Sequence, residues 1–255
     1  MAVAALAAAA VAIGVTLATR TEVPKQRAAP PRFFADPTAP ENVARDVREA
    51  LRAWPSGTVR RLRIVAAQHP ANALVRFELG LALLLEGSPD AAREAWREAE
   101  RVQPDSPSAV RAEDALHPGA PPGKPPFVAS FERPRTDAER LLALGVRYQA
   151  SLRPVAAQRA FAAAARIAPD DPEAQVAAAV GLYDKDRPEL AFSRLGPLVR
   201  RFPHAQTVRF HLGLLLIYLG QFREARSELR LAVAEGAHTP LAKQATVLLK
   251  ASRKR

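Results

Sequence analysis

The chain has 255 residues, 48% of them hydrophobic, and it contains no cysteine. The lack of cysteine excludes disulfide bonds, thiolate catalysis and thiolate metal sites. The formal net charge is +11, but the cationic residues are mostly arginines interspersed with glutamates, a pattern typical of solvated helix faces. We therefore expect no nucleic acid among the partners.

Residues 1–19 carry no charged side chain and are mostly alanine, valine, leucine and isoleucine. About twenty apolar residues span a bilayer as a helix, so the segment predicts a single-pass N-terminal membrane anchor. A cleaved secretory signal and a buried helix are the alternatives. Arg20, Lys25 and Arg27 follow the segment, which favours a cytoplasmic location for the rest of the chain. A true start upstream, with basic residues before Met1, would reverse this to the extracytoplasmic side.

Residues 20–40 contain five prolines, which predicts a semi-rigid linker. The next segment, 41–106, combines a degenerate or capping helical pair, at 41–54 and 58–68, with a first repeat unit that begins at Ala73. Segment 107–137 combines a helix at 108–116 with a proline-rich insertion at 118–134, whose paired prolines exclude a helix. The insertion is either a tolerated spacer or a polyproline segment that folds over a groove or is read by a partner.

Three further repeat units follow without a gap over 138–239, at a 34-residue period that indicates a solenoid. Each of the four units has a small residue on its first helix, namely Gly80, Gly145, Ala179 and Gly213. Twelve residues later, each unit has an alanine on its second helix, namely Ala92, Ala157, Ala191 and Ala225. The pattern predicts helix, short turn, helix in every unit. Residues 240–255 predict a capping helix and a basic tail.

This pattern resembles the tetratricopeptide repeat (TPR) family, over 73–106 and 138–239. The resemblance implies an all-α, TPR-like α-solenoid of about four to five helix-turn-helix repeats, preceded here by a transmembrane helix. It departs from the family at Arg76, Leu141, Gln175 and Arg209, where tryptophan is frequent, and at Ala237, where proline is expected.

In the TPR family, the first helix of each unit lines a concave groove. Carried over to this chain, those positions imply an apolar peptide-binding groove. Its residues are Phe77, Leu81, Leu84, Val146, Gln149, Val180, Tyr183, Phe210, Leu214 and Ile217. The lysine and asparagine with which some members clamp a carboxylate are absent. The alternative is that these side chains are buried against neighbouring repeats or under the proline-rich insertion.

No phosphate-binding loop, nucleophile elbow or histidine pair at metal-ligand spacing occurs in the sequence. We therefore expect a protein without catalytic residues, metal or cofactor. The predicted function is that of a membrane-tethered scaffold that binds a polypeptide segment of a partner protein. One alternative is a structural, self-associating assembly factor that forms a homo-oligomer. Another, by analogy alone, is an accessory subunit of an envelope biogenesis complex.

Overall fold

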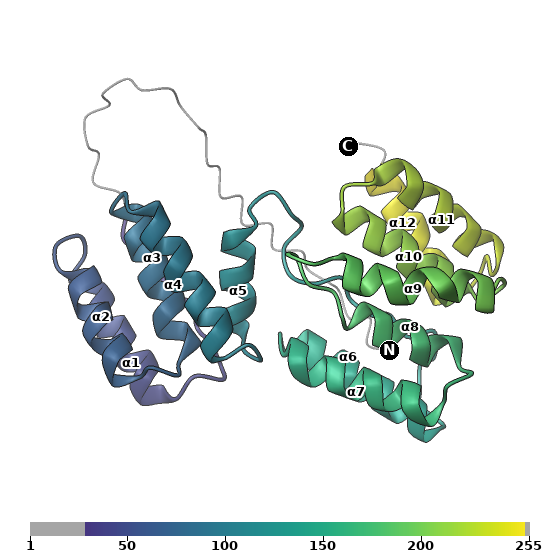
Figure 1. The fold of residues 1–255 in the computed structure, drawn as a ribbon, viewed down its shortest axis with the longest axis horizontal. Helices are drawn as coiled ribbons and strands as arrows, with labels where there is room; N and C mark the ends of the chain where they lie inside the picture. The colour runs from purple at the N-terminus through teal and green to yellow at the C-terminus, as the bar shows by residue number, and fades with distance from the viewer. Residues whose placement is uncertain (1–28, 253–255) are drawn as a thin grey trace.

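The computed structural model describes residues 29–252 and confirms the all-α prediction, with twelve helices and no strand in this range (Figure 1). Five helices form an N-terminal array: α1 (Glu41–Leu51), α2 (Thr58–Gln68), α3 (Ala73–Leu85), α4 (Pro89–Val102) and α5 (Pro107–Leu116). The remaining helices form a C-terminal array: α6 (Asp137–Ala150), α7 (Pro154–Ile167), α8 (Pro172–Val180), α9 (Glu189–Arg201), α10 (Gln206–Tyr218), α11 (Phe222–Ala234) and α12 (Pro240–Ala251). Figure 1 shows the two arrays as separate groups joined by the segment between α5 and α6.

The helices pack chiefly against their sequence neighbours, most closely in the pairs α3 and α4, α6 and α7, and α10 and α11. The turns inside these pairs share one hydrogen bond, in which the third residue past the helix end donates its N–H to a carbonyl in the last turn. In the first pair, Ser88 donates to Leu83 at 2.9 Å. The residue before the donor has a positive φ, supplied by Gly87 and Gly220 in two turns and by Leu152 in the third.

Glycines on the first helices make room for large side chains on the second helices. A Cβ at Gly145 would lie 2.2 Å from Cε1 of Phe161, and one at Gly80 would lie 2.2 Å from Nε1 of Trp96. These contacts explain why a small residue recurs at this position. Each large side chain stands four residues after the recurring alanine, which is itself buried.

Helix α8 is shorter than the repeat pattern predicts and ends at Val180, so Tyr183 lies in the following loop. The side chain of Asp184 accepts hydrogen bonds from the backbone N–H groups of Asp186 at 2.9 Å and Arg187 at 3.1 Å. Such local bonds offer the backbone an alternative to continuing the helix. The loop therefore replaces the last turn expected for this unit.

Polar contacts join the two arrays. Asp105, which follows α4, pairs with Arg153 at 2.9 Å, and Asp114 of α5 pairs with Lys185 at 2.5 Å. The Lys185 side chain is only 1% exposed. A buried ammonium group needs its counter-charge, so the Asp114 pair helps to fix the α8–α9 loop against α5.

The predicted single-pass membrane anchor needs correction. Across residues 29–252, every helix is too short or too polar to cross a bilayer. Residues 1–19, where the anchor was expected, lie outside the described residues.

A concave groove filled by the chain itself

The structure divides the predicted groove residues between the two arrays. Phe77, Leu81 and Leu84 belong to α3, and Phe77 lies in the apolar core of the N-terminal array. The others stand on the inward helices of the C-terminal array or just beyond them: Val146 and Gln149 (α6), Val180 and Tyr183 (α8 and its following loop), Phe210, Leu214 and Ile217 (α10). The ten residues therefore line two surfaces rather than one continuous groove.

Most of these side chains are covered rather than open to solvent. Phe210 is 1% exposed and Tyr183 is 4% exposed, and Val180, Leu214 and Phe77 are also buried. Val146, Gln149, Leu81 and Ile217 are half-buried, whereas Leu84 is exposed. This burial agrees with the alternative in which these side chains pack against neighbouring repeats or lie under the proline-rich insertion.

The proline-rich insertion fills the groove of the C-terminal array. Residues 124–130, here called the resident segment, contain no helix or strand. Their backbone N–H groups bond to side chains on all three inward helices. Phe127 donates to Oε1 of Gln149 on α6 at 3.1 Å, and Ser130 donates to Oε1 of Glu173 on α8 at 2.6 Å. Val128 donates to Nε2 of His211 on α10 at 2.9 Å.

Phe127 occupies an aromatic slot and is only 2% exposed. Its ring stacks on His211, with centroids 5.0 Å apart and an interplanar angle of 16°. It meets Phe161 edge-on, with centroids 5.4 Å apart. Aromatic pairs in these arrangements add stabilisation beyond that of burial alone. Phe127 is therefore the main apolar anchor of the resident segment.

His211 is held in one protonation state by its surroundings. Burial lowers its pKa to about 4, so the ring is neutral near neutral pH. Its Nδ1 lies 2.7 Å from the carbonyl oxygen of Thr207, which requires the proton on Nδ1. Nε2 is then free to accept the N–H of Val128. The histidine thus links α10 to the main chain of the resident segment.

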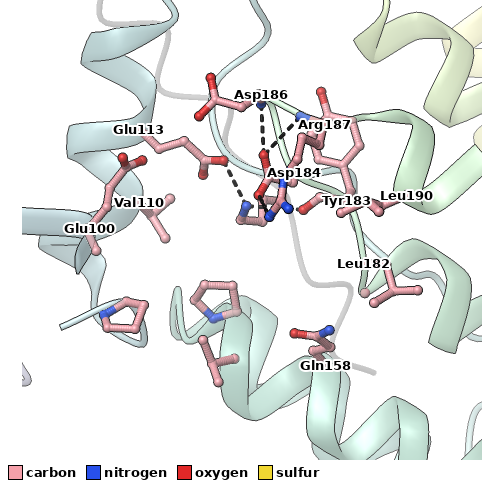
Figure 2. A pocket seen from close by; sticks show the side chains of 16 residues that line it. Glu100, Val110, Glu113, Gln158, Leu182, Tyr183, Asp184, Asp186, Arg187 and Leu190 are labelled. Carbon is pink, nitrogen blue, oxygen red and sulfur yellow. Dashed lines mark hydrogen bonds and ion pairs between the residues drawn. The ribbon is translucent and has the colours of Figure 1, made fainter. Parts of the chain in front are cut away.

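The start of the resident segment borders a pocket of about 350 Å³ between the two arrays. Figure 2 shows Glu100 and Glu113 on one side of this pocket, Asp184 and Arg187 on the other, and Asp186 above them. The Nζ atom of Lys124 lies 2.8 Å from Oε1 of Glu113 and 3.2 Å from the carbonyl oxygen of Tyr183. The pocket therefore holds one end of the resident segment through a cation.

The carboxylates around this pocket repel one another. Burial raises the pKa of Glu100 to about 7, and the nearby charges of Glu113, Asp186 and Asp184 act in the same direction. Lys124 partly offsets this effect. The environment accordingly favours positive charge.

A hydroxyl on α10 completes the contacts to Lys124. The Tyr218 hydroxyl donates to the carbonyl oxygen of Lys124 at 3.2 Å. Burial raises the pKa of Tyr218 to about 12, so the phenol stays protonated and remains a donor. Main-chain contacts of the resident segment thus extend from Lys124 to Ser130.

The N-terminal array is covered in a similar way by residues of the predicted linker. Phe34 packs edge-on against Phe77, with ring centroids 5.8 Å apart, and donates its N–H to Oε1 of Glu78 at 2.6 Å. Asp36 accepts the N–H of Ser108 on α5 at 3.0 Å. Part of segment 20–40 is therefore bound against α3 and α5.

His211 and Tyr218, which hold the resident segment through its main chain, were not among the predicted site residues. Gln149 was predicted and makes such a contact. One sequence signal could have pointed to the arrangement, because the insertion places Phe127 and Val128 directly after two prolines. A large aromatic residue is uncommon in a solvated linker.

Comparison with known proteins does not extend this description. No protein-family model matches the chain, and no curated protein matches its sequence.

Proposed function

We propose that the chain is a TPR-like, non-enzymatic scaffold that binds a segment of a partner polypeptide in the groove formed by α6, α8 and α10. The resident segment occupies this groove until a partner displaces it. One observation carries the proposal: Gln149, Glu173 and His211 accept backbone N–H groups from a non-helical stretch of chain.

Hydrogen bonds to main-chain N–H groups do not depend on the side chains of the bound segment, so a segment of another protein can make them equally well. Side-chain pockets, such as the slot for Phe127, then supply specificity. The acceptors stand on helices that pack together, so the site is formed in advance, which lowers the entropic cost of binding.

The resident segment competes with any partner because it is tethered beside the groove. A tethered ligand acts at an effective concentration on the order of millimolar. We therefore expect the intact chain to bind a partner segment weakly. A chain whose groove has been vacated should bind the same segment more tightly.

The test is a full-length variant in which residues 124–130 are replaced by a glycine-serine run of equal length. The probe is a fluorescent synthetic peptide that reproduces residues 123–131, titrated against the variant and the natural chain by anisotropy. We expect saturable binding to the variant and binding at least about tenfold weaker to the natural chain. A probe with alanine in place of Phe127 serves as the matched control.

A purely structural function is the competing account, and the burial of Phe127 at 2% exposure favours it. In that case the resident segment is a permanent part of the core. The glycine-serine variant should then fail to fold and lose its helical circular dichroism. The single variant Phe127→Ala then provides a second test, because it retains every backbone contact. The binding proposal would be refuted if both variants fail to fold. It would also be refuted if the glycine-serine variant folds but does not bind the probe.

A further inference from the structure

Resting on the function proposed above, we infer the chemistry of the partner segment. The geometry points to a non-helical segment with a basic residue three positions before an aromatic residue and proline between them. The cation enters the acidic pocket between the arrays, and the ring enters the slot between Phe161 and His211.

The cationic position is defined by Lys124. Its Nζ bonds to the carboxylate of Glu113 and to the carbonyl oxygen of Tyr183, and its side chain is 26% exposed. Glu113 is buried, and a charge-assisted bond to a buried carboxylate is stronger than a neutral one. A neutral side chain at this position would leave the Glu113 carboxylate without this cation, so the pocket selects for positive charge.

The pocket also has room for a cation larger than that of lysine. A volume of about 350 Å³ remains open beside Lys124, bordered by Glu100, Asp184, Asp186 and Arg187. Arg187 pairs with Asp184 at 3.5 Å, which leaves Glu100 and Asp186 as the carboxylates nearest to a new cation. Figure 2 shows these carboxylates arranged around the cavity. A guanidinium group is planar and can bond to two carboxylate oxygens at once. The pocket should therefore accept arginine as well as lysine.

The aromatic position is defined by the slot around Phe127. The flat stacking on His211 and the edge contact with Phe161 fit a planar ring. An aliphatic side chain would retain part of the burial but would lose both ring contacts. Buried aromatic anchors commonly dominate the binding energy of an interface.

The proline positions follow from the spacing of the backbone bonds. The N–H groups that bond to the groove belong to Phe127, Val128 and Ser130, so proline at 125 and 126 removes no donor from this set. Pro125 is buried and Pro126 is exposed. Proline also restricts the free peptide, which reduces the entropy lost on binding.

The test uses the glycine-serine variant of the full chain and four synthetic peptides. One has the resident sequence of residues 123–131. The other three carry arginine for Lys124, norleucine for Lys124, or alanine for Phe127. We expect arginine to bind within about threefold of lysine and norleucine about tenfold more weakly, matching a charge-assisted bond. Alanine for Phe127 should weaken binding at least about thirtyfold.

Glu113→Gln in the same variant assigns the charge effect to this pocket. It should weaken the lysine peptide and leave the norleucine peptide nearly unchanged, so that the two bind alike. If norleucine binds as tightly as lysine, the inferred specificity is refuted while the peptide-binding function stands. If none of the peptides binds to the folded variant, the function itself fails.

Discussion

Nε2 of His211 accepts the backbone N–H of Val128 at 2.9 Å, joining residues 83 positions apart in the sequence. This bond ties an inward helix of the C-terminal array to the main chain of the resident segment. It depends on a neutral imidazole, which burial provides by lowering the pKa of His211 to about 4. The same ring stacks on Phe127, so a single side chain supports both the main-chain contact and the aromatic anchor.

Replacing His211 tests this relationship. His211→Leu leaves the N–H of Val128 without its acceptor and removes the ring on which Phe127 stacks. We expect the free energy of unfolding in urea to fall by about 1–3 kcal/mol, the cost of an unpaired buried polar group. His204→Leu is the control, since its side chain is 87% exposed, and should change stability by less than about 0.5 kcal/mol. Equal effects of the two substitutions would argue against the contact.

Glu78 should make stability depend on pH. Burial raises its pKa from 4.5 to about 7 despite the bond from Phe34. Between pH 4.5 and about 7, Glu78 therefore holds a proton in the folded state that it has released in the unfolded state. The stabilisation from this proton is fully present below pH 4.5 and is lost as the pH rises through about 7. Relative to Glu78→Gln, we expect the natural chain to lose about 2–3 kcal/mol between about pH 4.5 and about pH 8. A stability difference that stays constant across this range would contradict the assignment.

Gly145→Ala tests the close approach of α6 and α7. The new Cβ would lie 2.2 Å from Cε1 of Phe161, whose ring also contacts Phe127. Because Phe161 has to move, we expect the free energy of unfolding, measured by heat or urea, to fall by about 1–3 kcal/mol. Gly196→Ala in α9 is the comparison, because a Cβ there meets no atom beyond its chain neighbours. Pro197 follows it and disfavours a helical backbone for a preceding residue with a Cβ, which offsets the gain in helix propensity, so the free energy of unfolding should change by less than about 0.5 kcal/mol. A neutral Gly145→Ala would mean that the helices do not pack as described.

Asp114→Ala tests the polar junction of the two arrays. The substitution removes the partner of Lys185, whose side chain is 1% exposed. It also removes the acceptor for the N–H of Gly123. Asp114 is itself 21% exposed, so we expect the free energy of unfolding in urea to fall by about 2 kcal/mol, less than for a fully buried pair. Asp170→Ala breaks an ion pair whose carboxylate is 91% exposed and should cost less than about 0.5 kcal/mol.

The helices could be predicted because their signals are local. Apolar spacing and flanking turn residues placed helices at 58–68 and 108–116, and the structure has them at Thr58–Gln68 and Pro107–Leu116. Pro104, Pro169 and Pro203 stand shortly after the ends of α4, α7 and α9, as expected of a residue that cannot continue a helix. The short α8 was missed because a loop replaces its last turn, and in this loop the side chain of Asp184 accepts the backbone N–H groups of Asp186 and Arg187.

The filled groove could not be predicted from the same signals. Residues 124–130 have no helical or strand periodicity, and their partners, such as His211, lie far away in the sequence. Helical spacing identified the inward faces of α6, α8 and α10 but not what covers them. The position of Phe127 depends on three helices at once, so only the assembled structure reveals it.

Amide hydrogen exchange of Val128 tests whether the resident segment leaves its site when a partner segment binds. It is measured by NMR on the isotopically labelled natural chain, alone and with an excess of the unlabelled peptide of residues 123–131. If the resident segment occupies its site, exchange of the Val128 amide in the chain alone should be slowed at least about a hundredfold. Excess peptide should remove that protection by displacing the resident segment. Two results would contradict displacement of the resident segment by a partner. One is protection of the Val128 amide that persists although the peptide binds, and the other is an amide that is unprotected in the chain alone.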